Sequence, residues 1–229
     1  MNRAKAHLMR NRTLPHARLT AACLLFVALA TPGARAQAIL EGVVALAPAT
    51  AAPPPDQRYQ NPTGGAIPPP EPPAAIIYLE GKFPEPPEPP RVQVPQKNFR
   101  FATELLPVRK GSTVEFPNQD DFYHNVFSYS KPKRFDLGRF LKTEKPPGQT
   151  FDQLGVVRLY CEIHEHMRCT VVVLDTPHFT KTDATGKYRL EKLPAGAYTL
   201  KAWLGEKKIR EQKVELRDGQ TLRVDFPAP

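Results

Sequence analysis

The residues best suited to chemistry are a cysteine, two histidines and a methionine around one short segment. That segment reads Cys161-Glu-Ile-His164-Glu-His166-Met167, and His124 lies 37 residues before Cys161. A thiolate, two imidazoles and a thioether form the donor set of a type 1 (blue) copper site, in which the two His and the Cys are trigonal and a long axial Met tunes the potential. The residues therefore predict a site for one copper ion at this segment.

Other interpretations of the same residues stay open at this point. Zinc also accepts Cys and His, but a thioether is a poor zinc ligand. A disulfide between Cys161 and Cys169 is an alternative, although it would leave His164 and Met167 without a role. We expect Cys169 to be a small buried apolar residue. We expect His166 at the surface, with metal ligation as the alternative.

Short β-strands must position these side chains. Val156–Cys161 is strand-like, and the chain resumes as a strand at Arg168 or Cys169, so the residues between suit a tight loop rather than a helix. His124 lies on or beside another expected strand. Helical periodicity is weak throughout, and many short strands with turn-rich connections predict an all-β sandwich. The other expected strands here are Val92–Val94, Phe99–Leu106, Ser112–Phe116, His124–Tyr129 and Cys169–Leu174.

Two pieces of this region resemble the cupredoxin family, which includes plastocyanin, amicyanin and pseudoazurin. They are Phe116–Val126 and Gly155–Met167, whose Cys-x2-His-x2-Met spacing is similar to the ligand loop of amicyanin. The resemblance covers about Val92 to Leu174 and implies a Greek-key β-sandwich in which His124, Cys161, His164 and Met167 are the copper ligands. It also implies that Asn125 ties the two ligand loops together by hydrogen bonds. Cys169 departs from the family, which usually has Gly or Ala near that position.

The N-terminus, residues 1–36, is predicted to be a secretory signal peptide. Basic residues without acids precede the apolar run Ala21–Ala30, and Ala34-Arg-Ala36 is a small-x-small cleavage site. The apolar run is shorter than the roughly 20 residues needed to span a bilayer, although an uncleaved anchor is the alternative. Without the six basic residues of this leader, the formal charge of +9 falls to +3, which gives no reason to expect nucleic-acid binding. We expect a periplasmic protein with no stable membrane insertion.

Residues 37–90 form a proline-rich segment with two strand-like pieces, Ile39–Leu46 and Ala74–Glu80. Of the 27 prolines, 16 lie between Pro48 and Pro95. Proline fixes φ and lacks a backbone donor, so these runs are expected to be extended loops rather than central strands. The cupredoxin-like region is then expected over residues 91–176.

The C-terminal residues 177–229 resemble carboxypeptidase regulatory-like (transthyretin-like) domains. Thr182–Leu190 and Leu193–Leu200 carry this resemblance, and in that family an N-terminal pair of strands precedes them. Gly42–Val44 and Ala75–Leu79 look similar to that pair. One hypothesis is therefore a discontinuous domain into which the cupredoxin-like region is inserted; two consecutive domains are the alternative. The whole chain after the leader also resembles bacterial methylamine-utilisation or plastocyanin-like proteins.

Two further segments have a composition that predicts their local structure or surface charge. The expected strands Lys208–Leu216 and Thr221–Phe226 flank Asp218-Gly219, which predicts a β-hairpin. Lys131–Lys145 holds six basic and two acidic residues. We interpret it either as a solvated loop or as a docking surface for an acidic redox partner, where charge would mainly speed encounter.

The residues favour a one-electron carrier over two other classes of protein. A periplasmic c-type cytochrome or a dehydrogenase is the expected partner. A copper storage or delivery protein without redox turnover is the alternative. An enzyme is not expected, because copper oxidases and nitrite reductases need further copper centres, and beyond the expected ligands only His166 and His178 remain after the leader.

Overall fold

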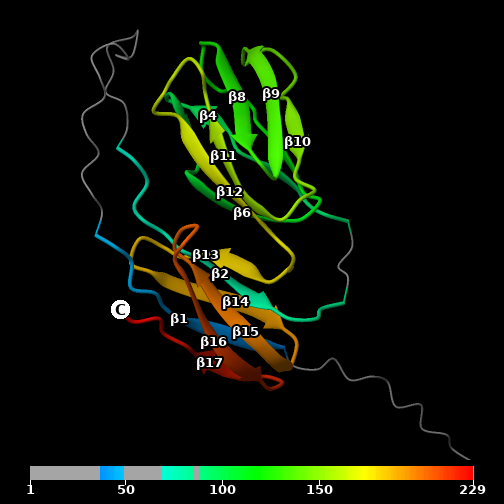
Figure 1. Ribbon diagram of the computed structural model, residues 1–229, viewed down its shortest axis with the longest axis vertical. Helices are drawn as coiled ribbons and strands as arrows, with labels where there is room; N and C mark the ends of the chain where they lie inside the picture. Colours follow the sequence, from blue (N-terminus) through cyan, green and yellow to red (C-terminus); the bar gives the residue numbers. More distant parts are fainter. Residues whose placement is uncertain (1–36, 49–68, 85–87, 229) are drawn as a thin grey trace, which may run out of the picture. The chain divides into compact units, whose positions relative to one another are not determined.

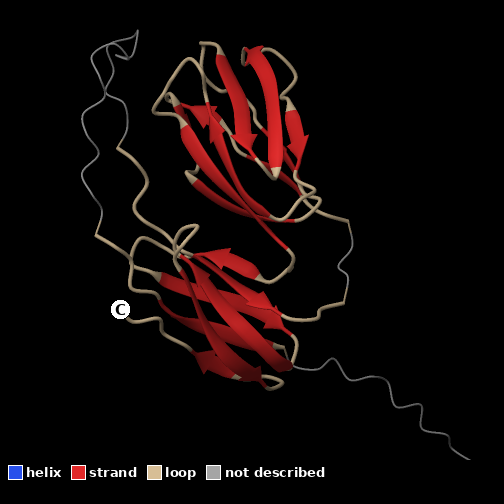
Figure 2. Ribbon diagram, in the orientation of Figure 1, coloured by secondary structure: helices blue, strands red, loops and turns tan. Residues whose placement is uncertain are grey.

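The computed structural model describes residues 37–48, 69–84 and 88–228, and these contain seventeen β-strands and no helix (Figure 2). The predicted all-β class is confirmed. The predicted leader and the parts of the proline runs within residues 49–68 and 85–87 lie outside the described residues. Within the described residues, no helix has the length and apolar character that a membrane crossing requires.

Strands β3 to β12 form a first β-sandwich (Figure 1). Its five-stranded sheet contains, in spatial order, β6 (Leu105–Arg109), β12 (Arg168–Leu174), β11 (Gly155–Tyr160), β8 (His124–Ser130) and β9 (Lys133–Phe140). Its three-stranded sheet contains β10 (Gly148–Thr150), β7 (Thr113–Glu115) and β3 (Arg91–Gln93), and a small hairpin is made by β4 (Gln96–Lys97) and β5 (Arg100–Phe101). Fully buried apolar side chains, including Phe116, Phe151 and Leu159, fill its core.

The remaining strands form a second β-sandwich of two sheets. One sheet contains β14 (Lys187–Leu193), β1 (Ala38–Val43) and β17 (Thr221–Arg223), in that order. The other contains β13 (Phe179–Lys181), β2 (Ile76–Glu80), β15 (Gly196–Trp203) and β16 (Ile209–Leu216). Leu40, Leu79, Leu193 and Leu200 belong to its buried core.

The two early strands pair only with late strands. Strand β1 is antiparallel to β14 and parallel to β17. Strand β2 is antiparallel to both β13 and β15. The discontinuous-domain hypothesis requires this pairing, in which the ten strands of the first sandwich separate β2 from β13 along the chain.

Three local predictions were wrong. Lys131–Lys145 is not a loop throughout, because β9 occupies Lys133–Phe140 as the edge strand of the larger sheet. Charged side chains on an edge strand protect it from pairing with other chains, and they hide its strand character in the sequence. The expected strand Phe99–Leu106 is divided into β5 and β6, and between them the hydroxyl of Thr103 bonds to the backbone of Leu105, a local bond that competes with strand pairing.

The hairpin predicted around Asp218-Gly219 is not formed. A tight turn is present, with Gly219 at φ 71°, but β16 pairs with β15 whereas β17 pairs with β1 in the other sheet. The physical reason is that turn residues favour a local reversal of the chain but do not select a partner. Leu222 and Val224 pack against the second core, so burial draws this segment across to the opposite sheet.

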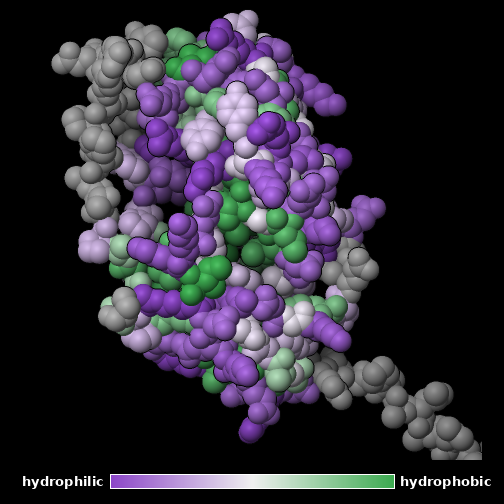
Figure 3. All heavy atoms as spheres, viewed as in Figure 1, coloured by the Kyte–Doolittle hydropathy of each residue, from purple (hydrophilic) through white to green (hydrophobic). Residues whose placement is uncertain are grey.

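Polar residues cover most of the described surface on the face shown in Figure 3, and apolar residues gather there in a few patches. The large apolar side chains that are exposed, among the described residues, are Tyr123, Tyr129, Leu154 and Ile209. Single exposed apolar side chains are normal in folded proteins and need no special explanation.

Candidate metal centre

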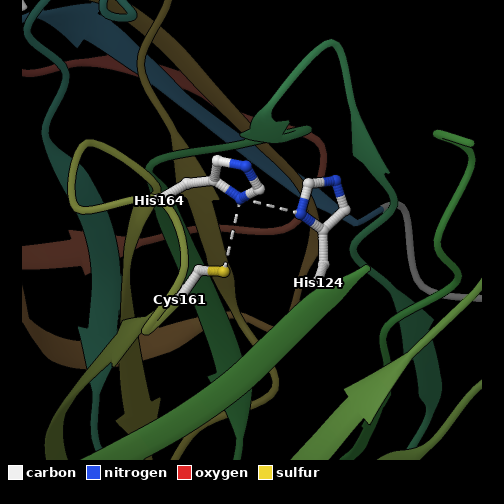
Figure 4. Close-up of side chains that lie close together, drawn as sticks. All are labelled: His124, Cys161 and His164. Carbon is white, nitrogen blue, oxygen red and sulfur yellow. Dashed lines mark hydrogen bonds between the residues drawn. The ribbon is translucent and has the colours of Figure 1, made fainter. Parts of the chain in front are cut away.

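Three of the predicted residues converge at one end of the first sandwich. His124 is the first residue of β8, Cys161 directly follows β11, and His164 lies in the loop before β12. Their side chains point toward one another (Figure 4), and one ligand atom from each lies within 4.8 Å of the others. His164 Nδ1 is 3.2 Å from His124 Nδ1 and 3.7 Å from Cys161 Sγ.

The cluster is largely shielded from water. His124 is 0% exposed, Cys161 is 3% exposed and Met167 is 1% exposed, whereas His164 is half-buried. Cys161 and Met167 both belong to the apolar core of the first sandwich. Electrostatic and ligand interactions are stronger in such a pocket than in water, because the local dielectric constant is low.

The predicted tight loop is present and is closed by its own backbone. The amide of Met167 donates to the carbonyl of His164 at 2.9 Å, and the amide of Cys161 donates to the carbonyl of Met167 at 3.3 Å. Strands β11 and β12 continue the pairing on either side, with Tyr160 opposite Arg168. The loop therefore returns the chain within a few residues while keeping Cys161 and His164 on one side.

Asn125 makes the hydrogen bonds that the resemblance implies. Its Oδ1 accepts from the amide of Glu162, next to Cys161, at 3.3 Å. Its Nδ2 donates to Asp136 Oδ1 at 2.7 Å and to the carbonyl of Gly138 at 3.3 Å. Asn125 thus joins the segment that carries His124 to the loop that carries Cys161, and it anchors both to β9.

Asp120 fixes the proton position on His124. Asp120 Oδ2 lies 2.9 Å from His124 Nε2. Burial acts to raise the pKa of Asp120, but hydrogen bonds from the Phe99 amide, His124 and the Asn98 amide outweigh it, so the pKa is lowered. An ionised carboxylate only accepts hydrogen bonds, so His124 carries its proton on Nε2 and offers the lone pair of Nδ1 to the cluster.

His164 is also neutral near pH 7. Burial, and then the proximity of His124 and His166, lowers the pKa of His164 to about 4. Burial likewise lowers the pKa of His124, although Asp120 opposes this. Because His124 Nδ1 bears no proton, the 3.2 Å contact between the two rings has His164 Nδ1 as donor. A metal ion bound there would need His164 to carry its ring proton on Nε2 instead, and Cys161 to release its thiol proton.

This donor set fits copper. A buried thiol and two neutral imidazoles point their ligand atoms into one small space, and a buried methionine follows in the same loop. Soft sulfur favours Cu(I), and imidazole suits both oxidation states. The agreement with copper rests on the chemical type of the donor atoms and on the unprotonated Nδ1 of His124.

The two thiols have different surroundings. Both Cys161 and Cys169 are free, so the alternative disulfide is not formed. Cys169 lies on β12 opposite Leu159, and burial raises the pKa of its thiol well above the ordinary value. A neutral buried thiol is weakly reactive, as expected for a small apolar residue.

His166 is not a plain surface residue, which corrects the expectation from sequence. It is half-buried, and its Nε2 lies 2.8 Å from the carbonyl oxygen of Phe99, to which it donates. Its Nδ1 has no hydrogen-bond partner. His166 does not belong to the cluster formed by His124, Cys161 and His164.

Sequence reasoning missed two residues at the site, Asp120 and Phe99. The ring of Phe99 packs edge-on against His164 and His124, with centroids 5.0 and 6.0 Å away. Neither residue has a motif that would identify it, because Asp120 lies in a turn-like Asn-Gln-Asp-Asp stretch and Phe99 in an expected strand. The four-residue spacing between Asp120 and His124 was the only available signal.

Comparisons with known proteins give one family and several structures. Residues 167–228 match the family model described as Carboxypeptidase regulatory-like domain. A mutant amicyanin in the Cu(I) state is 26% identical over 36% of this chain and 81% of its own, with a TM-score of 0.34. A purple cupredoxin from Nitrosopumilus maritimus is 24% identical over 37% and 98%, with a TM-score of 0.32.

A copper-containing nitrite reductase from Thermus scotoductus SA-01 is also similar, at 24% identity over 42% of this chain and 24% of its own, with a TM-score of 0.35. The comparison with curated proteins gives no match. The chain is therefore an all-β protein of two sandwiches, in which residues 167–228 match the carboxypeptidase regulatory-like domain family and strands β3 to β12 form the sandwich that carries the His124, Cys161 and His164 cluster.

Proposed function

We propose that this chain is a periplasmic type 1 copper protein that carries one electron at a time. His124, Cys161 and His164 would hold the ion, and Met167 would be the axial ligand. The observation that carries this proposal is the convergence of one sulfur and two imidazole nitrogens within 4.8 Å in a mostly buried pocket. A bound copper ion would supply a reversible Cu(II)/Cu(I) couple.

The chain's own residues suit the site to rapid electron transfer. Asn125 and the backbone bonds of the Cys161–Met167 loop hold the ligands in place, so little rearrangement would accompany a change of charge. The buried thiol and thioether exclude water from the pocket. His164 is the half-buried member of the set, and its ring edge is the proposed route to a partner.

The partner would be a c-type cytochrome or a dehydrogenase of the same compartment. The basic segment Lys131–Lys145 is less free to dock such a partner than its composition indicates. Lys133 pairs with Asp152 at 3.0 Å and Arg139 with Glu162 at 2.7 Å, and Lys142 pairs with Asp121. Electrostatic steering by this segment is therefore expected to be modest, with a correspondingly weak salt dependence of the association rate.

The proposed domain organisation follows the strand pairing. Residues 91–176 would form the copper domain, inserted into a regulatory-like domain made of β1, β2 and the strands of residues 177–229. Support comes from β1 pairing with β14 and β17, and from β2 pairing with β13 and β15. We assign the second domain a structural or recognition role rather than an enzymatic one.

A copper titration tests the function. Purified protein, with any leader removed, is titrated with Cu(II) while absorption in the visible range is recorded, and the reduction potential is then measured. We expect one copper per chain, intense thiolate-to-copper absorption, a reversible potential and fast exchange with a cytochrome c. A colourless Cu(I) complex that resists oxidation would favour storage or delivery instead. Absence of copper binding would contradict both.

A further inference from the structure

One carboxylate at the site receives three hydrogen bonds from two different segments. Asp120 Oδ1 accepts from the amide of Asn98 at 2.8 Å. Asp120 Oδ2 accepts from the amide of Phe99 at 2.9 Å and from His124 Nε2 at 2.9 Å. The Asp120 side chain is 10% exposed and that of His124 is 0% exposed, so water competes little for these bonds.

The turn held by Asp120 is strained. Asn98 and Phe99, which link β4 to β5, both have left-handed φ values, and a bulky residue such as Phe rarely adopts them. Strain of this kind persists when surrounding contacts enforce it, and it often marks a functional site. Here the enforced residue is Phe99, whose ring lies against His124 and His164 and whose carbonyl accepts from His166.

We propose that Asp120 is a positioning residue that holds both the His124 ring and the Phe99 turn in the arrangement needed for copper. This inference rests on the proposed function and extends it to a residue beyond the ligand set. The carboxylate keeps Nδ1 of His124 directed at Cys161 and His164, and it keeps the Phe99 ring over the ring edges of the two histidines. The same carboxylate makes His124 a stronger electron donor.

The donor effect has a definite sign. A carboxylate that accepts from the outer nitrogen of a ligating imidazole raises the basicity of that imidazole. A more basic imidazole stabilises Cu(II) relative to Cu(I), which lowers the reduction potential. Asp120→Asn removes the negative charge of the side chain at nearly constant volume. The asparagine side chain has one acceptor oxygen, whereas three donors (the amides of Asn98 and Phe99, and His124 Nε2) bond to the aspartate. The variant should therefore raise the potential and loosen at least one of the three bonds.

Asp121→Asn is a matched control. Asp121 adjoins Asp120 and carries the same charge, but its side chain is 76% exposed and pairs with Lys142 rather than with His124. Both variants change the net charge of the chain by the same amount. We expect Asp120→Asn to raise the potential clearly more than Asp121→Asn. Equal shifts, or no shift in Asp120→Asn, would overturn the donor effect.

A second measurement needs no copper. Imidazole nitrogen NMR of the metal-free wild-type chain should show His124 protonated on Nε2 and bare on Nδ1. In Asp120→Asn, exchange of the Nε2 proton with solvent should speed up by about tenfold or more, because a bond to a charged acceptor is lost. In Asp121→Asn, the exchange rate should stay at the wild-type value. A proton on Nδ1 of His124 in the wild-type chain would overturn the proposal.

These readouts separate the two proposals. If the wild-type chain binds no Cu(II) but His124 has the expected tautomer, the proposed function fails and positioning by Asp120 stands. If copper binds with intense colour but His124 has the other tautomer, the function stands and the role of Asp120 fails. The backbone amide spectrum verifies that each variant is folded. If Asp120→Asn does not fold, the tautomer of His124 in the wild-type chain still tests the role of Asp120.

Discussion

The two sandwiches differ in where they bury polar groups. In the first sandwich the buried residues include Gln96, Asn118, His124, Asn125 and Ser128. In the second sandwich the buried core is almost wholly apolar, and the charged residues pair at its surface. Those surface pairs join Arg189 to Glu41 and Glu191, Lys201 to Glu80 and Glu211, and Arg223 to Asp225.

This difference locates the chemistry. Burying a polar group costs free energy unless it is hydrogen-bonded, so a fold gains nothing from gathering such groups without a use for them. In the first sandwich, Asn118 donates to the carbonyls of Phe122 and Phe140 and thereby supports the turn that carries Asp120. In the second sandwich, the buried polar side chain of Thr182 accepts from the amide of Ala75.

The largest expected effect separates the two buried thiols. Cys161→Ala should abolish the thiolate-to-copper absorption, because Cys161 is the cysteine that lies with His124 and His164 in the described cluster. Cys169→Ala makes the same change at a buried site on β12 and should keep the colour, at a stability cost of about 1 kcal/mol. Absorption spectra after Cu(II) addition measure both. Colour that survives in Cys161→Ala would refute the assignment of the first sandwich as the copper domain.

An intermediate effect compares one buried hydrogen-bonding side chain from each sandwich. Asn125→Ala removes an acceptor of the Glu162 amide, and Thr182→Ala removes the acceptor of the buried Ala75 amide, at 3.0 Å. Each should lower the free energy of unfolding by about 1–3 kcal/mol. Only Asn125→Ala should also speed the loss of copper. Denaturant unfolding and copper release kinetics test this, and similar copper release from both variants would contradict it.

The smallest expected effect is on how the stability of the metal-free protein depends on pH. The pKa of His164 is lowered to about 4, and burial also lowers those of His124 and His166. Unfolded histidines titrate near 6.5, so between about 6.5 and 4 the unfolded chain binds more protons than the folded one. Stability of the metal-free protein should therefore fall as pH falls through that window.

The single tryptophan, Trp203 on β15, packs against a buried cluster that includes Val172 and Leu174 of β12, so its fluorescence does not isolate one sandwich, and circular dichroism is the readout here. Circular dichroism reports on the strands of both sandwiches. Acidification from pH 7 to 4.5 should lower the denaturation midpoint of the metal-free protein measured by circular dichroism. A midpoint that is constant or rises over this range would show that the histidines do not control the acid sensitivity of the first sandwich.

The sequence was most informative where residue type and local pattern act together. His124 beginning a strand, Cys161 following one and the short return at Arg168 were all predicted, because apolar alternation and turn spacing are local properties. Asp120 was missed because its partners, the amides of Asn98 and Phe99, are about twenty residues away, and no pattern in a single chain reports such a contact.

The sequence also did not predict which strands pair with one another. The prediction of a turn at Asp218-Gly219 was correct, but the prediction of a hairpin was wrong. Strand β16 pairs with β15 and β17 pairs with β1, which lie in different sheets of the second sandwich. Strand β9 was missed because its charged residues indicated a solvated loop, although Phe135 and Leu137 alternate with them and pack against the first core. The hairpin error concerns a long-range choice of partner, which a local pattern does not contain.

The parallel pairing of β1 with β17 has a consequence for the order of events during synthesis. Ile39 lies opposite Thr221, so β1 waits about 180 residues for this neighbour to leave the ribosome. All strands of the first sandwich are made in between, and their mutual contacts are complete once β12 has emerged. A nascent chain ending at Leu174 already contains every side chain of the metal cluster, while β1 and β2 still lack partners. If the first sandwich folds first, the flexible chain between the early strands β1 and β2 and the late strands becomes shorter. The entropic cost of pairing the early strands with the late ones is then lower.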